Sequence, residues 1–259
     1  MSESPFFSPY KQSDIPIRQY RGKSPMFYRD AAFMGAVFTA ELGALRELLK
    51  DSGLSPVEVW PGRGLAAIFC LQYRDSDIGP YNEVSLSLPV RRRGFGPLEA
   101  LRALQSGSFH AWVAELPVTT EAALYGGVDY FNYPKYLAEI SFREEGGRRS
   151  CALRDKATGE LILEFSGEKI GTKASPGPAG SLLEFNTYPR KDGRSLRARM
   201  LVNELDGGAS YLRERARLSL GGHPRAEPFR RLKLGRQLYH LSVPRCEAIL
   251  FMPEILPPE

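Results

Sequence analysis

Residues that build disulfide frameworks and metal sites are scarce in this sequence of 259 residues. Its three cysteines lie far apart and form no Cys-x-x-Cys pair, and its three histidines show no ligand spacing. These absences argue against a secreted fold held by disulfides and against a zinc knuckle. The sequence therefore predicts no metal site and no other cofactor.

Long apolar runs are also missing. No segment approaches the roughly 20 consecutive apolar residues that a membrane-spanning helix needs. Residues 1–21 are polar and lack the apolar core of a signal peptide. The sequence therefore predicts a cytoplasmic protein that has no membrane partner.

The charge is mildly basic, with a formal net charge of +5. Such a balance can indicate nucleic acid, an anionic membrane or an anionic small substrate as partner. Nucleic-acid binding favours a stripe of Lys and Arg with aromatic residues, whereas the basic residues here mostly alternate with acidic and apolar ones. The one dense run, Arg91-Arg92-Arg93, is interpreted as a solvated loop or a subunit contact. We therefore expect no nucleic-acid partner and rank a nucleic-acid binder last among the functions.

Short segments of alternating apolar character dominate the chain. Residues 1–24 are expected to form an irregular arm, and residues 25–259 a single domain. Asp192-Gly193 and Asp206-Gly207-Gly208 are turn signals between strands. Strands are predicted at Leu65–Tyr73, Val84–Val90, Phe109–Leu116, Tyr136–Phe142, Ser150–Arg154, Glu160–Lys169, Leu182–Tyr188, Leu196–Asn203, Arg215–Leu220 and Ala248–Phe251.

Helical signals are fewer. Leucines share one face in Thr39–Lys50, a proline suits the first turn of Pro97–Gln105, and a threonine can cap Thr119–Leu124. The pair Gly126-Gly127 is interpreted as a turn that requires positive φ. Many strands and few helices predict an α+β fold, mainly antiparallel, in which a barrel or cone-like sheet encloses a pocket with a few helices outside.

The most informative stretch is Tyr133-Pro134-Lys135-Tyr136, where a lysine follows a proline between two tyrosines. Pro134 fixes the local backbone and so the direction of Lys135. A lysine amine can attack a carbonyl only when desolvation or a nearby cation frees it from its proton, and the aromatic neighbours can keep water away. Composition alone would instead make Lys135 an exposed surface lysine.

This stretch resembles a known family signature. Tyr133–Ala138 is similar to the Tyr-Pro-Lys-Lys-Leu-Gly of acetoacetate decarboxylases, and Gly127-Val128-Asp129 resembles their Gly-Arg-Glu. Further similar segments follow in the family's order over nearly the whole chain, so that the chain resembles the acetoacetate decarboxylase-like superfamily. These segments are Phe27–Asp30, Leu45–Leu49, Ile78–Glu83, Asp192-Gly193 with Leu196–Glu204, Ala216–Leu220 and Leu241–Leu250.

The resemblance implies roles for individual residues. Lys135 would form an imine with the substrate, and Glu83 would be the pocket carboxylate that transfers protons or holds a hydroxyl. Arg29 would face the pocket and pair with the substrate carboxylate. For Arg29 an ordinary structural ion pair is an equal alternative.

Tyrosines supply the remaining candidates for contact with substrate. Tyr133 and Tyr136 could donate a proton or hydrogen-bond an oxygen, and Tyr81 and Tyr239 are weaker candidates for the same task. For Tyr136, packing in the pocket wall is an equal alternative, and for Tyr133 it is the favoured one.

Two departures from the family pattern bear on the reaction. The decarboxylases carry a second lysine directly after the nucleophile, where this chain has Tyr136. They also carry an acid on the preceding strand, whereas Leu65–Gln72 contains none and has Ile68 near that place. These departures disfavour simple acetoacetate decarboxylation and favour the aldol–dehydration chemistry of superfamily relatives that use 2-keto acids such as pyruvate.

The implied function is therefore a Schiff-base-forming lyase that acts on a keto acid through an imine and enamine on Lys135, with an aldehyde as second substrate. A β-keto acid decarboxylase and a non-catalytic barrel that binds a small ligand remain the alternatives. The resemblance also implies a homo-oligomer.

Overall fold

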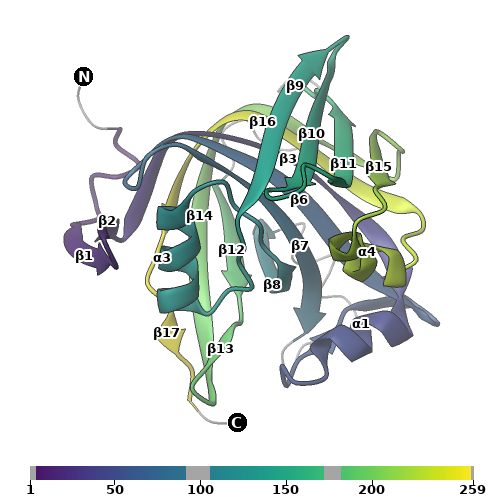
Figure 1. Ribbon diagram of the computed structural model, residues 1–259, viewed down its shortest axis with the longest axis horizontal. Coiled ribbons are helices and arrows are strands. Elements are labelled where there is room, and N and C mark those ends of the chain that lie inside the picture. The colour runs from purple at the N-terminus through teal and green to yellow at the C-terminus, as the bar shows by residue number, and fades with distance from the viewer. Residues whose placement is uncertain (1–3, 92–105, 172–181, 258–259) are drawn as a thin grey trace.

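The computed structural model describes residues 4–91, 106–171 and 182–257, so the predicted helix Pro97–Gln105 lies outside it. A barrel forms its centre (Figure 1). Neighbouring barrel strands are antiparallel except β8 and β12, which are parallel, and this confirms the predicted α+β class with a mainly antiparallel barrel. The seven strands follow one another around it as β7 (Tyr81–Arg91), β8 (Ser108–Glu115), β12 (Leu182–Thr187), β14 (Arg194–Tyr211), β16 (Gln237–Leu250), β3 (Met26–Glu41) and β6 (Arg63–Ser76), which pairs back onto β7.

A smaller antiparallel sheet stands beside the barrel, at the upper right of Figure 1. The short elements of the described chain are β4 (Ser55–Pro56), β5 (Glu58–Trp60), β13 (Arg190–Lys191), β17 (Glu254–Ile255) and the 3-10 turn Pro224–Ala226. The smaller sheet itself runs in the order β15 (Ala216–Leu220), β11 (Leu161–Glu168), β10 (Arg148–Asp155) and β9 (Ala138–Glu145).

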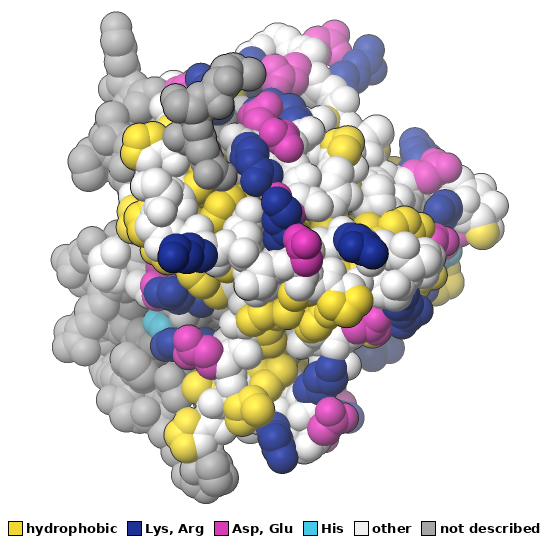
Figure 2. Space-filling view, turned by 90° about the vertical axis from the view of Figure 1, so that its left-hand side faces the viewer, with side chains coloured by type: hydrophobic (Ala, Val, Ile, Leu, Met, Phe, Trp, Pro, Cys, Tyr) yellow, Lys and Arg dark blue, Asp and Glu magenta, His cyan; other side chains and the backbone are white. Residues whose placement is uncertain are grey.

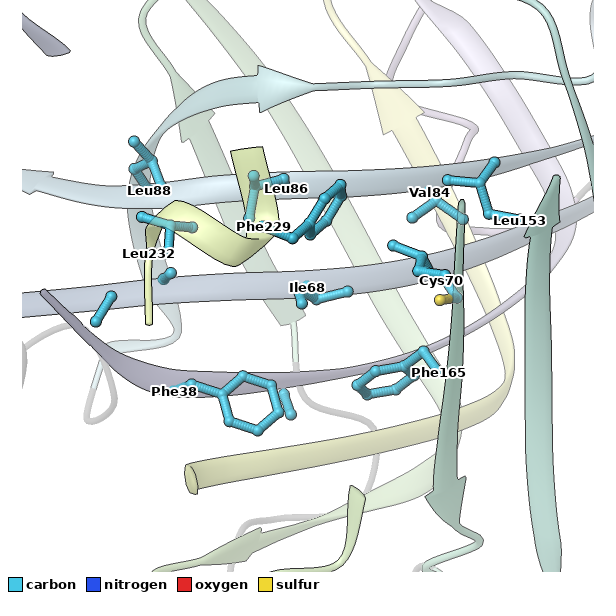
Figure 3. Packing of buried hydrophobic residues seen from close by; sticks show 14 of the residues in the cluster. Phe38, Ile68, Cys70, Val84, Leu86, Leu88, Leu153, Phe165, Phe229 and Leu232 are labelled. Atoms are coloured by element: carbon cyan, nitrogen blue, oxygen red, sulfur yellow. The ribbon is translucent and has the colours of Figure 1, made fainter. Parts of the chain in front are cut away.

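The main hydrophobic core lies between the barrel and this sheet. Figure 3 shows Ile68 of β6 and Leu86 of β7 facing Phe165 of β11 and Phe229 of the short helix α4 (Glu227–Arg231), and all four are at most 1% exposed. Because successive side chains of a strand point to opposite faces, the alternate residues of these strands face the barrel interior. Both faces are therefore buried, which explains the nearly uninterrupted apolar run from residue 65 to residue 71.

The two larger helices differ from their predicted bounds. Helix α1 (Leu42–Leu49) begins three residues after the start of the predicted Thr39–Lys50, because residues 39–41 pair with β6. Helix α3 (Glu121–Phe131) is capped by the side chain of Thr120 and extends beyond the predicted end. The interpretation of Gly126-Gly127 as a turn is wrong, since both residues are helical. Close packing requires the small size of glycine at residue 127.

The N-terminal segment is more ordered than an irregular arm. Strands β1 (Ser13–Ile17) and β2 (Tyr20–Ser24) form an antiparallel hairpin. Ile17 is buried, and a Cβ added to Gly126 would lie 3.4 Å from its Cδ1 atom. Arg18 donates to both carboxylate oxygens of Asp129 at 2.9 and 3.0 Å. The hairpin thus packs on α3 and holds it in place.

Strand length was underestimated at β3, β14 and β16, whose pairings contain bulges. No strand was predicted over β3, and only the last residues of β16 were. The predicted turn at Asp206-Gly207-Gly208 lies inside β14, where the register against β16 shifts twice. A bulge inserts an extra residue and breaks the period-two alternation on which strand prediction depends.

Charges of both signs are mixed on the surface. On the face drawn in Figure 2, Lys and Arg side chains lie beside Asp and Glu, with hydrophobic side chains between them. Within the described segments, no helix is both long and apolar enough to cross a bilayer.

His240 links the barrel to the smaller sheet. It is fully buried, with Nδ1 3.0 Å from the Gly35 carbonyl of β3 and Nε2 2.9 Å from the Glu168 carbonyl of β11. Burial lowers the pKa of the imidazole, and the two carbonyl acceptors oppose this shift. A Cβ added to Gly167 would lie 2.4 Å from the ring, so the approach depends on glycine.

We expect Gly167→Ala to lower the free energy of unfolding by about 1–3 kcal/mol, because the added methyl overpacks a fixed ring. The control is Gly43→Ala in α1, where an added Cβ meets nothing within 4 Å and helix propensity raises stability by up to about 1 kcal/mol. Urea unfolding of both variants measures the difference. Unchanged stability of Gly167→Ala would contradict the close packing at His240.

Candidate functional site

A cavity of about 330 Å³ lies inside the barrel. Inward-facing residues from every barrel strand line it, among them Ala67, Phe69, Phe109 and Phe185. The volume falls within the range of about 300–1,000 Å³ that is usual for pockets that bind small molecules. The barrel can therefore enclose an organic ligand.

Lys135 and Glu83 meet in the cavity wall. The Nζ atom of Lys135 donates to Oε2 of Glu83 at 2.6 Å, and the two side chains are 6% and 9% exposed. Both line the cavity, and Lys135 is the only lysine or arginine among the described residues that do so. The structure thus brings together the two residues for which the sequence predicts catalytic roles.

The backbone holds this pair in register. Glu83 forms a bridge with Val118, and Val118 forms a parallel bridge with Leu137 two residues after the lysine. The N–H of Lys135 also donates to the Tyr133 carbonyl at 2.8 Å, which fixes the turn before it. Residues 83 and 135, far apart in the sequence, are therefore fixed on neighbouring segments.

Helix α3 makes room for the lysine side chain. Asn132 ends the helix with φ of 53° and turns the chain back, so that the lysine passes beside Gly127. A Cβ added to Gly127 would lie 2.2 Å from Cε of Lys135 and 3.2 Å from Nζ. The absence of a side chain at residue 127 is thus what admits the amine to its position.

Three tyrosines surround the pair. Tyr81 lines the cavity with its ring centre 5.9 Å from Nζ of Lys135, and its hydroxyl lies 3.1 Å from that of Tyr28. The Tyr133 hydroxyl lies 2.6 Å from Oγ1 of Thr187. Burial raises the pKa of Tyr28, Tyr81 and Tyr133, so these phenols keep their protons at neutral pH and can donate hydrogen bonds.

Two predicted substrate contacts lie outside the cavity. Arg29 follows the inward-facing Tyr28 and points the other way, where it donates to Asp77 at 2.8 Å. Tyr136 follows Lys135 and packs against the outer core, with the guanidinium of Arg225 3.7 Å from its ring centre. Alternation along an extended chain places both on the opposite side from their inward neighbours.

The position predicted for the missing acid also requires correction. Ile68 is fully buried in the outer core, so the inward positions of β6 beside it are Ala67 and Phe69. The departure from the family pattern remains, because neither residue is acidic.

A further carboxyl, which no sequence pattern indicated, lies on the interior face of the barrel. Glu204 pairs with Cys246, which lines the cavity, and paired residues of neighbouring strands share a face. Burial raises the pKa of Glu204 to about 7, and its Oε1 atom has no hydrogen-bond partner. Glu204 comes just before a bulge, and no sequence signal marked it.

No group of three or more His, Cys, Asp and Glu side chains in the described segments is arranged to hold a metal ion.

Two further cavity residues, Tyr28 and Tyr73, were not predicted from the sequence to face the cavity. Strand alternation applied to the Tyr28-Arg29 pair would have shown that only one of the two can face inward.

A sequence model of the acetoacetate decarboxylase (ADC) family matches residues 3–248. The search of curated proteins found no match in sequence. Acetoacetate decarboxylase from Legionella pneumophila subsp. pneumophila has a similar structure, with a TM-score of 0.63 and 14% identity over 90% of this chain and 87% of that one. Another acetoacetate decarboxylase gives a TM-score of 0.61 at 15% identity, covering 90% and 89%.

The enduracididine biosynthesis enzyme MppR complexed with pyruvate gives a TM-score of 0.61 at 13% identity and 90% coverage of both chains. MppR has also been solved with the condensation product of pyruvate and imidazole 4-carboxaldehyde, at a TM-score of 0.55, 13% identity, and 89% and 88% coverage. At these identities the likeness is one of fold.

We expect Lys135→Met to lower the free energy of unfolding by about 3 kcal/mol or more, because it leaves the Glu83 carboxylate buried without its cation. The double variant Lys135→Met, Glu83→Gln carries no buried charge and should recover more than half of that loss. Guanidinium chloride unfolding gives the three values. Additive losses would be inconsistent with a coupled pair.

Glu204 should make stability depend on pH. Its pKa is raised from 4.5 to about 7 on folding, so its stabilising contribution is complete below pH 4.5 and is lost as the pH rises through about 7. We expect Glu204→Gln to exceed the wild type by about 1–2 kcal/mol at high pH and to match it in acid. The exposed Glu164→Gln is the control, and a difference that does not change with pH would refute the assignment.

Proposed function

This chain belongs to the acetoacetate decarboxylase family, and from that premise we propose that it is an enzyme in which Lys135 forms an imine with a keto acid. The observation that carries this proposal is the amine of Lys135, buried in the cavity wall 2.6 Å from Glu83. A buried amine beside one carboxylate, facing a space that a ligand can enter, suits attack on a carbonyl carbon.

The first step is proton transfer within the pair. When the Lys135 ammonium gives a proton to Glu83, a buried ion pair becomes a neutral amine and a carboxylic acid, which an apolar site accommodates without charge burial. The amine lone pair then forms the N–C bond as the carbonyl π electrons move to oxygen. Glu83 returns the proton to that oxygen, and loss of water leaves an iminium.

Carbon–carbon bond making is the favoured continuation. The Glu83 carboxylate removes a proton from the carbon next to the iminium, which gives an enamine. The enamine carbon bonds to an aldehyde carbonyl, whose oxygen takes the proton from Glu83. Glu83 then moves a second proton from that carbon to the new hydroxyl, which leaves as water while a C=C bond forms. A water molecule hydrolyses the iminium and frees Lys135. In this proposal Tyr81 and Tyr133 donate hydrogen bonds to substrate oxygens.

Two observations favour this route over decarboxylation of acetoacetate. The position of the family's second lysine is occupied by Tyr136, which packs outside the cavity. The inward face of β6 near the pair presents Ala67 and Phe69 and no acid. MppR, which shares the fold, has been solved with pyruvate and with a pyruvate–aldehyde condensation product.

A non-catalytic barrel that binds a small ligand is the second candidate. The predominantly apolar wall of the cavity favours it, because apolar lining suits binding without chemistry. The two candidates differ in one observable, a covalent bond at Lys135.

We expect borohydride to trap pyruvate, and more weakly acetoacetate, on Lys135. Intact mass gives the extent of reaction, and peptide mapping gives the modified residue. Lys135→Met should give no adduct. A correctly folded protein that traps none of a broad keto-acid panel would exclude the imine and leave the binding barrel.

Two glycine variants make the test specific to the position of the amine. Gly127→Ala pushes a methyl into the Lys135 stem and should reduce trapping by about tenfold or more, since a displacement of the reacting atom by about 1 Å can cost a hundredfold. Gly126→Ala, one residue earlier in α3, makes only an ordinary contact at 3.4 Å and should trap normally. Equal trapping in the two variants would contradict the role given to Gly127.

A further inference from the structure

The cavity is chemically uneven. One group of polar side chains lies near Lys135 and Glu83, where Tyr28, Tyr81 and Tyr133 supply hydroxyls. His110, Asn186 and Tyr239 also line the cavity. Much of the remaining wall is aliphatic or aromatic, and two polar groups within it satisfy each other. These are Ser85 and Ser87, whose hydroxyls lie 2.6 Å apart.

Phenylalanines from opposite walls meet inside the cavity. The ring centres of Phe69 on β6 and Phe185 on β12 lie 6.2 Å apart, and Phe109 on β8 stacks on Phe185 at 5.3 Å. Phe69 pairs with Ser85, one inward position beyond Glu83 on β7. A ligand bonded to Lys135 would therefore extend onto a surface of phenylalanine rings.

A short keto acid leaves this surface uncovered. Pyruvate places its carbonyl, carboxylate and methyl close to the amine, and the apolar space beyond has few polar partners to hold water. Each methylene that a longer substrate buries there improves binding about fourfold, and an aromatic ring gains further from stacking on the phenylalanines.

We infer that the carbonyl compound that reacts with Lys135 carries a large apolar, preferably aromatic, group that lies against Phe69, Phe109 and Phe185. The inference rests on the proposed imine and names the class of its substrate: a 2-keto acid with an aryl or long alkyl side chain. The keto-acid head meets Lys135 and the phenols, and the side chain fills the apolar part of the cavity.

The test compares borohydride trapping on Lys135 for pyruvate, 2-ketobutyrate, 2-ketohexanoate and phenylpyruvate. Trapping of each acid on butylamine corrects for its intrinsic reactivity. We expect half-saturating concentrations to fall about fourfold for each added methylene, and phenylpyruvate to be favoured over pyruvate by on the order of a hundredfold.

Cavity variants locate the apolar group. Ala67→Leu fills part of the space and should reduce the ratio of phenylpyruvate to pyruvate trapping by about tenfold. Phe185→Leu removes a stacking ring and should lower phenylpyruvate trapping relative to 2-ketohexanoate. This variant tests the inference if Ala67→Leu does not fold. Ala157→Leu, the same exchange in an exposed turn, is the control and should keep the wild-type ratio.

The outcomes separate the two proposals. A high ratio that falls in the cavity variants supports the inference. Trapping of pyruvate as efficiently as the longer acids overturns the apolar substrate class and leaves the imine intact. Absence of any Lys135 adduct overturns the proposed function and the inference with it.

Discussion

The buried contact between Lys135 and Glu83 is the constraint on which the surrounding structure depends. Two opposite charges 2.6 Å apart, with side chains 6% and 9% exposed, persist in an apolar interior only when each holds its partner, because removal of either leaves an uncompensated charge. Such a pair needs two segments in fixed register. Strand β7 supplies the segment that carries Glu83, and the bridges through Val118 to Leu137 fix the segment that carries Lys135.

The barrel strands beside the smaller sheet are buried on both faces. The outward residues of β3, β6 and β7 form the core with the smaller sheet, and their inward residues line the cavity. Polar inward positions are therefore few, and Glu83 is one that has a specific partner. The N-terminal hairpin contributes from outside, because it supports α3 and so the glycine beside the lysine stem.

The sequence predicted which two charged residues meet in the cavity, but not the directions of their neighbours. Lys135 and Glu83 were identified because a local signature and an ordered series of segments do not depend on knowing the register. Arg29 and Tyr136 were candidates for substrate contact, with an ion pair and wall packing as their equal alternatives. Alternation along the extended chain turns each of them away from the cavity. Glu204 escaped notice because a bulge follows it, and Gly127 was read as a turn because only tertiary contact with the lysine reveals why a helix keeps glycine there.

The residue after the nucleophile shows what the departure from the family signature means physically. A second lysine directly after the nucleophile and facing it would repel the ammonium form of the nucleophile and so favour the neutral amine. Tyr136 instead faces outward and stacks on Arg225. Among the described cavity residues, the amine of Lys135 then has Glu83 as its near base. In the proposed reaction the iminium restores a positive charge directly beside the substrate. Lys135 is the only lysine or arginine among the described residues of the cavity wall. The positive charge of the iminium, together with the phenol hydroxyls, can therefore stabilise the substrate carboxylate. The bond that activates the keto acid thus also helps to bind its carboxylate.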